Sequence, residues 1–120
     1  MTTHATDILD DIRAATESRD ADALSALYAD DARITIVDRS SPPSAPATVH
    51  GRREIDEYLR EHCGREMTHR VGDEVRSGDR LAYTTACRYP DGTRVLCASV
   101  AHLDPGGRID RQTIVQAWDE

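Results

Sequence analysis

The most restrictive feature of the sequence is a regular series of short turns in its second half. Four segments there alternate apolar and polar residues with the period of a β-strand, at about 67–76, 80–89, 94–103 and 109–118. The turns between them are short and contain glycine: Ser77-Gly78-Asp79, Tyr89-Pro90-Asp91-Gly92-Thr93 and Asp104-Pro105-Gly106-Gly107. Because connections this short join antiparallel neighbours, the sequence predicts a four-stranded antiparallel meander.

The middle hairpin also predicts a register. A three-residue loop pairs Tyr89 with Thr93, which fixes the residues opposite each other on the two strands. One face of this pair is then apolar with small polar groups, as ligand cavities often are: Leu81, Tyr83, Thr85, Cys87, Cys97, Ser99, Ala101 and Leu103. The same register sets Cys87 and Cys97 diagonally, which disfavours a disulfide between them.

The first half of the chain predicts three helices and one more strand. Residues 7–19 have the spacing of an amphipathic helix, with Thr6 as its N-cap. Asp20 begins a second, shorter helix whose apolar face ends at Tyr28. A β-branched strand is expected at 33–38. A third helix follows Gly51, with one face formed by Ile55, Tyr58, Leu59 and His62.

Residues 39–50 are rich in serine and proline and predict a long loop, either mobile or acting as a lid over a pocket. Together these elements predict one α+β domain over residues 1–120. In this fold about three N-terminal helices pack against a curved antiparallel sheet.

The composition indicates which binding partners and which cellular compartment to expect. The net charge is −7 and every basic residue is arginine, without a basic run, so we expect no nucleic-acid partner. No apolar stretch approaches the roughly 18 residues of a membrane span, so no membrane is expected. Three cysteines without CxxC spacing favour a reduced, cytoplasmic setting and argue against a zinc site. Neither a metal nor a cofactor is expected.

Three stretches resemble a known superfamily. They are Leu24-Ser25-Ala26-Leu27-Tyr28-Ala29-Asp30-Asp31-Ala32, Val49-His50-Gly51-Arg52-Arg53-Glu54-Ile55 and His102-Leu103-Asp104-Pro105-Gly106-Gly107-Arg108-Ile109. They look like landmarks of the SnoaL-like branch of the nuclear-transport-factor-two superfamily, which includes ketosteroid isomerases. The resemblance implies a cone-shaped fold of cystatin-like topology around one pocket, and a homodimer formed by the outer face of the sheet. Many relatives are cofactor-free isomerases, cyclases or dehydratases that act on small hydrophobic molecules.

The resemblance also excludes one reaction. The positions that align with the ketosteroid isomerase base, oxyanion tyrosine and protonated aspartate are Ile36, Ile12 and Ala101 in this chain. None of these side chains can move a proton or donate a hydrogen bond. Ketosteroid isomerisation by that set of residues is therefore not expected.

His69 is the strongest catalytic candidate. It has the parity of Met67, Val71 and Val75, so it is predicted on the apolar face, where a histidine can act as a general acid or base. A similar strand histidine is implied by the resemblance to scytalone dehydratase-like relatives. The alternative is a core histidine satisfied by a backbone carbonyl. Asp38 is a second candidate, as a base or as a group that orients His69; the alternative is a turn aspartate.

Other residues are candidates for substrate binding. Tyr28, Tyr58 and Tyr83 could each direct a hydroxyl at a substrate, and the alternative is packing with the hydroxyl at the pocket rim. Ser99 lies on the predicted inner face. The last strand adds Gln116 and Trp118, although its parity leaves open which face is buried. His102 is predicted on the outer face, and the remaining histidines at the surface: His4, His50 and His62.

Two functions remain open. One is cofactor-independent acid–base chemistry on a small hydrophobic carbonyl compound, of isomerase, cyclase or dehydratase type. The other is a non-catalytic module for binding small molecules or for dimerisation. No HExxH, glycine-rich phosphate loop or GxSxG is present, so metalloprotease, nucleotide and hydrolase-triad functions have no support.

Overall fold

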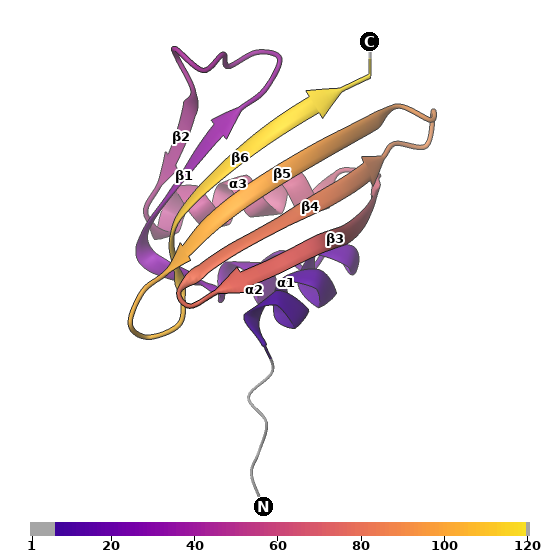
Figure 1. The fold of residues 1–120 in the computed structure, drawn as a ribbon. Coiled ribbons are helices and arrows are strands. Elements are labelled where there is room, and N and C mark those ends of the chain that lie inside the picture. Colours follow the sequence, from indigo (N-terminus) through magenta and orange to yellow (C-terminus); the bar gives the residue numbers. More distant parts are fainter. Residues whose placement is uncertain (1–6, 120) are drawn as a thin grey trace, which may run out of the picture.

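The computed structural model describes residues 7–119. A curved sheet of six strands has the order β2-β1-β6-β5-β4-β3, and three helices cover one of its faces (Figure 1). The elements are α1 (Ile8–Glu17), α2 (Ala21–Ser25), β1 (Tyr28–Val37), β2 (Ala47–His50), α3 (Arg52–Gly64), β3 (Thr68–Ser77), β4 (Arg80–Arg88), β5 (Arg94–Leu103) and β6 (Ile109–Trp118). The predicted α+β class with a curved sheet and three helices is confirmed.

The meander forms with the predicted register. Strands β3 to β6 pair antiparallel in chain order. Thr85 lies opposite Cys97 and Cys87 lies opposite Val95, as the hairpin loop requires. Along β5 every second side chain is buried, so one face of the sheet packs under the helices and the other faces outward.

The sheet is mixed, whereas the sequence predicted an antiparallel one. β1 lies parallel to β6, with Ile34 opposite Gln112. The turn signals could not indicate this pairing, because they constrain only strands that follow each other in the chain. The loop predicted at 39–50 also contains β2, which pairs antiparallel with β1 and forms the edge of the sheet.

The predicted second helix is too long. α2 ends at Ser25, and Tyr28 is the first residue of β1 instead of the last apolar residue of a helix. The tertiary partner explains the difference, since the amide of Ile109 in β6 donates to the carbonyl of Leu27 at 2.8 Å. At α1 the cap is Asp7, which accepts from the amide of Leu9 at 3.0 Å. The predicted cap, Thr6, lies outside the described residues.

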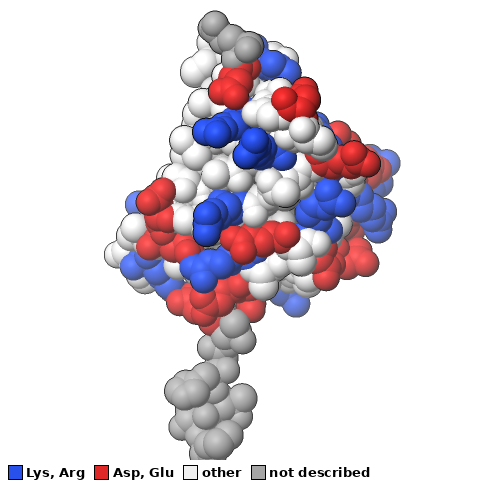
Figure 2. All heavy atoms as spheres, turned by 90° about the vertical axis from the view of Figure 1, so that its right-hand side faces the viewer, with Lys and Arg blue, Asp and Glu red and all other residues white. Residues whose placement is uncertain are grey.

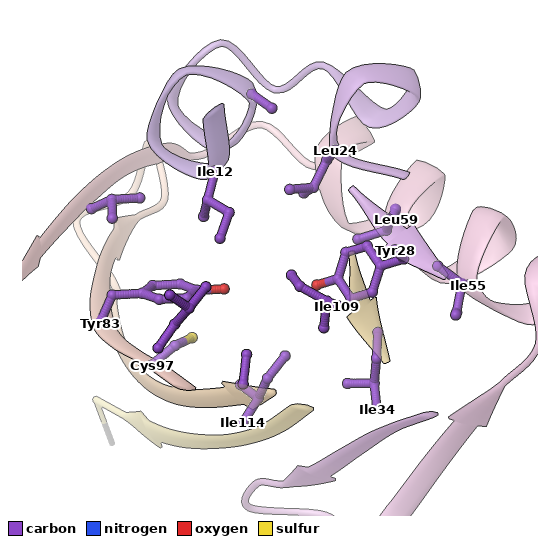
Figure 3. Packing of buried hydrophobic residues seen from close by; sticks show 14 of the residues in the cluster. Ile12, Leu24, Tyr28, Ile34, Ile55, Leu59, Tyr83, Cys97, Ile109 and Ile114 are labelled. Carbon is purple, nitrogen blue, oxygen red and sulfur yellow. The ribbon is translucent and has the colours of Figure 1, made fainter. Parts of the chain in front are cut away.

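The core fills the space between the concave sheet face and the helices (Figure 3). Its largest fully buried side chains are all aliphatic: Ile12, Ile34, Ile55, Leu81 and Ile109. Burying each such side chain contributes roughly 1.5 to 3 kcal/mol, so a chain without phenylalanine can still form a stable core.

The surface carries charges of both signs. Figure 2 shows arginine and acidic side chains intermingled over one face of the molecule. Of the helices in the described part of the chain, none is both long and apolar enough to cross a membrane.

Candidate functional site

Inside the cone lies a small cavity, the inner chamber, with a volume of about 50 Å³. This is room for a few water molecules or one small chemical group. Both helices and strands supply its walls, which are Thr16, Leu24, Tyr28, Tyr58, Leu59, His62, Cys63, His69, Tyr83, Thr85, Cys97, Ser99, Gln112, Ile114 and Gln116.

A larger hollow, the vestibule, adjoins the inner chamber. Its volume of about 430 Å³ lies within the range of small-molecule sites. It is lined by Ile36, Asp38, Arg39, Ser40, Ala47, Val49, Tyr58, Glu61, His62, Arg65, Gln116 and Trp118. Three side chains line both spaces and so mark their boundary: Tyr58, His62 and Gln116. The segment predicted as a loop, 39–50, contributes Arg39, Ser40, Ala47 and Val49 to the vestibule wall.

His69 lies on the buried face of β3 and is only 8% exposed. Its Nδ1 atom is 3.2 Å from the Sγ atom of Cys87, so a thiol occupies the place that a backbone carbonyl would take in a purely structural histidine. Its Nε2 atom is buried and has no hydrogen-bond partner among the described residues. Buried polar atoms are nearly always paired, so this nitrogen is notable in a wall of the inner chamber.

His62 is half-buried, whereas the sequence predicted it at the surface. Its ring centroid is 5.1 Å from that of His69 and 6.0 Å from that of Tyr58. Burial, with the nearby His69 and Arg65, lowers its pKa to about 4. The ring is therefore neutral at pH 7. The sequence could have indicated this position, because His62 lies one helical turn after Tyr58 on the same face of the helix. Of the other histidines, His50 is exposed, His102 lies 3.3 Å from Arg111 on the outer face, and His4 is outside the described residues.

Two buried tyrosines are joined through one glutamine. Tyr28 donates its hydroxyl proton to Oε1 of Gln112, and Nε2 of Gln112 donates to the Tyr83 hydroxyl at 2.9 Å. In Figure 3 both hydroxyls point towards the centre of the cone. Burial raises the pKa of Tyr28 and of Tyr83, where hydrogen bonds with Ser99 and Gln112 reduce the effect. Both rings are therefore neutral, and Tyr83, which accepts from Gln112, keeps its own proton to donate.

On the last strand, β6, the side chains of the glutamines point into the cone. Gln112 is 2% exposed and Ile114 is buried, whereas Val115 is 47% exposed. This decides the parity that the sequence left open. Gln116 accepts from Nε1 of Trp118 at 3.1 Å, beside the vestibule.

Trp118 is held between two other side chains at the vestibule. Its ring stacks on Tyr89 with a centroid distance of 6.1 Å. The guanidinium carbon of Arg39 lies 4.1 Å from the ring centroid, a cation–π contact. Tyr58 lies at the boundary with the inner chamber, where burial raises its pKa.

Asp38 lies in the vestibule wall, away from the inner chamber. Its Oδ1 atom accepts from the amide of Ser40 at 2.9 Å, as in a turn, and its backbone bridges to Ser41. No hydrogen bond joins Asp38 to His69 within residues 7–119. The structure thus brings six candidates to the chamber (Tyr28, Tyr58, His69, Tyr83, Ser99 and Gln116) and leaves Asp38 and Trp118 in the vestibule.

The residues aligned with the ketosteroid isomerase groups form part of the apolar core. Ile12, Ile36 and Ala101 are each at most 5% exposed. The polar groups of this chamber come from other positions: His69, His62, Tyr83, Ser99 and Gln112.

Comparison with known proteins agrees with this architecture. The SnoaL-like domain family matches residues 9–112, so the chain belongs to the SnoaL-like domain family. No curated protein matches the sequence.

Solved structures of the same fold are distant in sequence. A protein of cystatin-like fold from Silicibacter pomeroyi has 18% identity and a TM-score of 0.74, covering 91% of this chain and 72% of its own. A ketosteroid isomerase candidate from Kribbella flavida has 19% identity and a TM-score of 0.76, covering 96% and 78%. SalBIII, an epoxide hydrolase/cyclase-like enzyme in pyran ring formation in the polyether salinomycin, has 23% identity and a TM-score of 0.72, covering 92% and 88%. At these identities the likeness concerns the fold.

Proposed function

We propose that the protein catalyses cofactor-independent acid–base chemistry, of isomerase, cyclase or dehydratase type, on a small hydrophobic carbonyl compound. The observation that carries this proposal is the buried, unpartnered Nε2 of His69 in the same chamber wall as the Tyr83 hydroxyl. One group can take a proton and the other can donate a hydrogen bond. Family membership supports the general kind of chemistry, because the fold's relatives include cyclase-like enzymes.

The two volumes suggest how a substrate would lie. The inner chamber, at about 50 Å³, is too small for a ligand of ordinary size, whereas the vestibule at about 430 Å³ is not. The hydrophobic body would therefore rest in the vestibule against Trp118, with Asp38 near its outer end. Only a carbonyl group and its neighbouring carbon would pass Tyr58 and His62 into the inner chamber.

The hydrogen bonds of the chamber assign a role to each group. If Nδ1 of His69 carries the proton and donates to Cys87, the lone pair lies on Nε2, which acts as the base. Tyr83 receives a hydrogen bond from Gln112 and donates its own proton to the carbonyl oxygen, where negative charge develops. Because both groups are held on strands, they are positioned before the substrate binds.

Hydrogen–deuterium exchange tests this function. Proton abstraction next to a carbonyl would let the protein accelerate exchange into a panel of small cyclic ketones in D₂O, followed by proton NMR. We expect His69→Gln to slow this by about 10²-fold or more, the usual contribution of a general base. His102→Gln, on the outer face, should leave it unchanged. Equal exchange by folded His69→Gln would contradict the role of His69.

A non-catalytic module for small-molecule binding or dimerisation is the second candidate. The outer face of the sheet favours it, because three large aliphatic side chains lie exposed on adjacent strands β5 and β6. Leu96 is 52% exposed, Val100 53% and Val115 47%. Contiguous apolar surface of this kind typically forms an interface. A homodimer built on this face, with binding but no ketone exchange by the wild type, would favour the second function.

A further inference from the structure

One arginine of the vestibule has no acidic partner in the described part of the chain. Arg39 follows the end of β1 and lies beside the end of β6, because these two strands run parallel (Figure 1). Its guanidinium carbon is 4.1 Å from the ring centroid of Trp118, and the group makes no hydrogen bond or ion pair with residues 7–119. A guanidinium has five N–H donors, so Arg39 brings donors to the vestibule that no described residue accepts.

The other charged side chains of the vestibule are already engaged. Arg65 donates to the Glu61 carboxylate from Nε at 2.8 Å and from Nη2 at 2.9 Å, so these two charges balance each other. Asp38 accepts from the amide of Ser40 at 2.9 Å, and no ion pair joins it to Arg39 within the described residues. Of the cations that the structure describes in the vestibule, Arg39 is therefore the one available to a ligand.

Trp118 gives Arg39 a fixed support. The indole ring stacks on Tyr89 at a centroid distance of 6.1 Å, and its Nε1 atom donates to Gln116 at 3.1 Å. The Tyr89 hydroxyl in turn accepts from Nη1 of Arg65 at 3.3 Å. Because the indole is held by these contacts, the guanidinium over it is positioned before a ligand arrives, which lowers the entropy cost of binding.

We propose that the vestibule binds a small apolar carboxylate, and that Arg39 holds its carboxylate group through two parallel hydrogen bonds. A planar guanidinium matches a carboxylate in this way, and charge-assisted bonds of this kind are roughly twice as strong as neutral ones. Ile36, Val49 and Tyr58 provide apolar walls for the rest of the ligand. The volume of about 430 Å³ accommodates a molecule of that size.

As a statement about the substrate, this proposal rests on the proposed function, because it adds a carboxylate to the hydrophobic body that lies in the vestibule. Carboxylate binding itself needs no turnover, so the two can fail separately. Loss of ketone exchange with intact carboxylate binding would reject the function alone. Ketone exchange without carboxylate binding would reject the carboxylate site alone, because the neutral ketones of that assay have no group for Arg39 to bind.

The single tryptophan of the chain is the probe for this site. Fluorescence of Trp118 is followed while hydrocinnamate is added to the full chain, and then hydrocinnamamide, which has the same size without the charge. We expect a change that saturates, with the acid binding about tenfold or more tightly than the amide. The cationic analogue phenylpropylamine should bind more weakly than either, because the guanidinium repels it.

Three variants assign the effect to individual charges. Arg39→Gln should remove the preference for the acid and leave binding of the amide unchanged. Arg33→Gln is the matched control, since it makes the same charge change at an exposed position of β1 that does not line the vestibule. Asp38 lines the vestibule and opposes an anion there, so Asp38→Asn should tighten binding of the acid by about threefold.

Several outcomes would overturn the proposal. Equal binding of the acid and the amide by the wild type would do so, and tighter binding of the amine would assign the vestibule to Asp38 and a cation instead. An indole signal that stays constant at every acid concentration would also exclude the site. If Arg39→Gln and Arg33→Gln weaken acid binding equally, net charge is responsible and not Arg39. Thermal unfolding shows whether each variant folds, and the comparison of the three ligands on the wild type needs no variant.

Discussion

At the scale of single residues, the chamber holds two imidazoles in different settings. His69 has a thiol partner on one ring nitrogen and none on the other, whereas His62 packs between aromatic rings at the edge of the vestibule. The first suits proton transfer, because its free nitrogen belongs to a ring that lines the chamber. The second serves as a neutral wall, since its burial opposes a positive charge.

The low pKa of His62 predicts how stability changes with pH. Folding lowers this pKa from an ordinary 6.5 to about 4, so the unfolded chain binds one more proton between these values. The contribution of His62 to the free energy of unfolding is therefore full above pH 6.5 and falls as the pH drops towards 4. Urea unfolding at pH 7, 5.5 and 4.5 measures it.

His62→Gln should flatten that pH dependence, because an amide of similar size cannot take up a proton. His50→Gln is the matched control, since His50 is exposed and should leave the wild-type slope unchanged. If the two variants lose stability with pH equally, His62 is not the group responsible.

Residues of the site could be predicted where strand parity alone decides their direction. Tyr83 and Ser99 lie on strands whose buried face the hairpin register fixed, and His69 was placed by the apolar parity of its own strand. All three line the chamber. Gln112 was not chosen although it has the parity of Gln116 and Trp118, because its bonds to Tyr28 and Tyr83 join strands that lie far apart in the chain. The position of His62 in the site was not predicted, because the sequence pattern of a helix that lines a pocket is the same as that of a helix at the surface.

At the scale of elements, one arginine joins the helices to the first strand. Arg52, at the start of α3, donates from Nη1 to the carbonyl of Ser25 at 2.9 Å and from Nη2 to the carbonyl of Tyr28. It thus satisfies carbonyls at the short connection between α2 and β1. This connection sets where the Tyr28 side chain enters the chamber.

Arg52→Lys should lower the free energy of unfolding by about 1 to 3 kcal/mol, because one ammonium group cannot reach both carbonyls in the geometry of a planar guanidinium. Chemical denaturation in urea measures this. Arg53→Lys is the control, since Arg53 is exposed. A loss below about 0.5 kcal/mol, the range of ordinary surface changes, would show that the connection is held by other contacts.

Elements that begin and end at recognisable turn sequences could be predicted. Elements whose limits depend on contacts with distant parts of the chain could not. Gly92, with a φ of 93°, and the other glycine turns order the meander. The end of α2 and the parallel pairing of β1 with β6 depend on Ile109, which lies far along the chain from Leu27. Local sequence contains no signal for such a contact.

At the scale of the whole molecule, the cone has two chemically different sides. The concave side holds the chamber, and the convex side exposes the aliphatic side chains of β5 and β6. Val100→Glu would place a charge within that outer patch. If the homodimer forms there, the variant should be monomeric by sedimentation velocity, because burying an unpaired carboxylate is strongly unfavourable.

Val75→Glu serves as the control, since Val75 is 60% exposed on β3 at the far edge of the sheet. It should keep the wild-type mass. A wild type that is monomeric at all concentrations tested would contradict the dimer, and a Val100→Glu variant that stays dimeric would move the interface elsewhere.

The parallel pairing of β1 with β6 has a consequence for the order of folding. Tyr28 finds its neighbour, Ile109, only after the intervening helix and the four intervening strands have been made. During synthesis on the ribosome, β1 can pair early with β2, but its other edge stays open until β6 emerges. Long-range pairing of this kind slows folding. The chamber is therefore closed late, when β6 places Gln112 between Tyr28 and Tyr83.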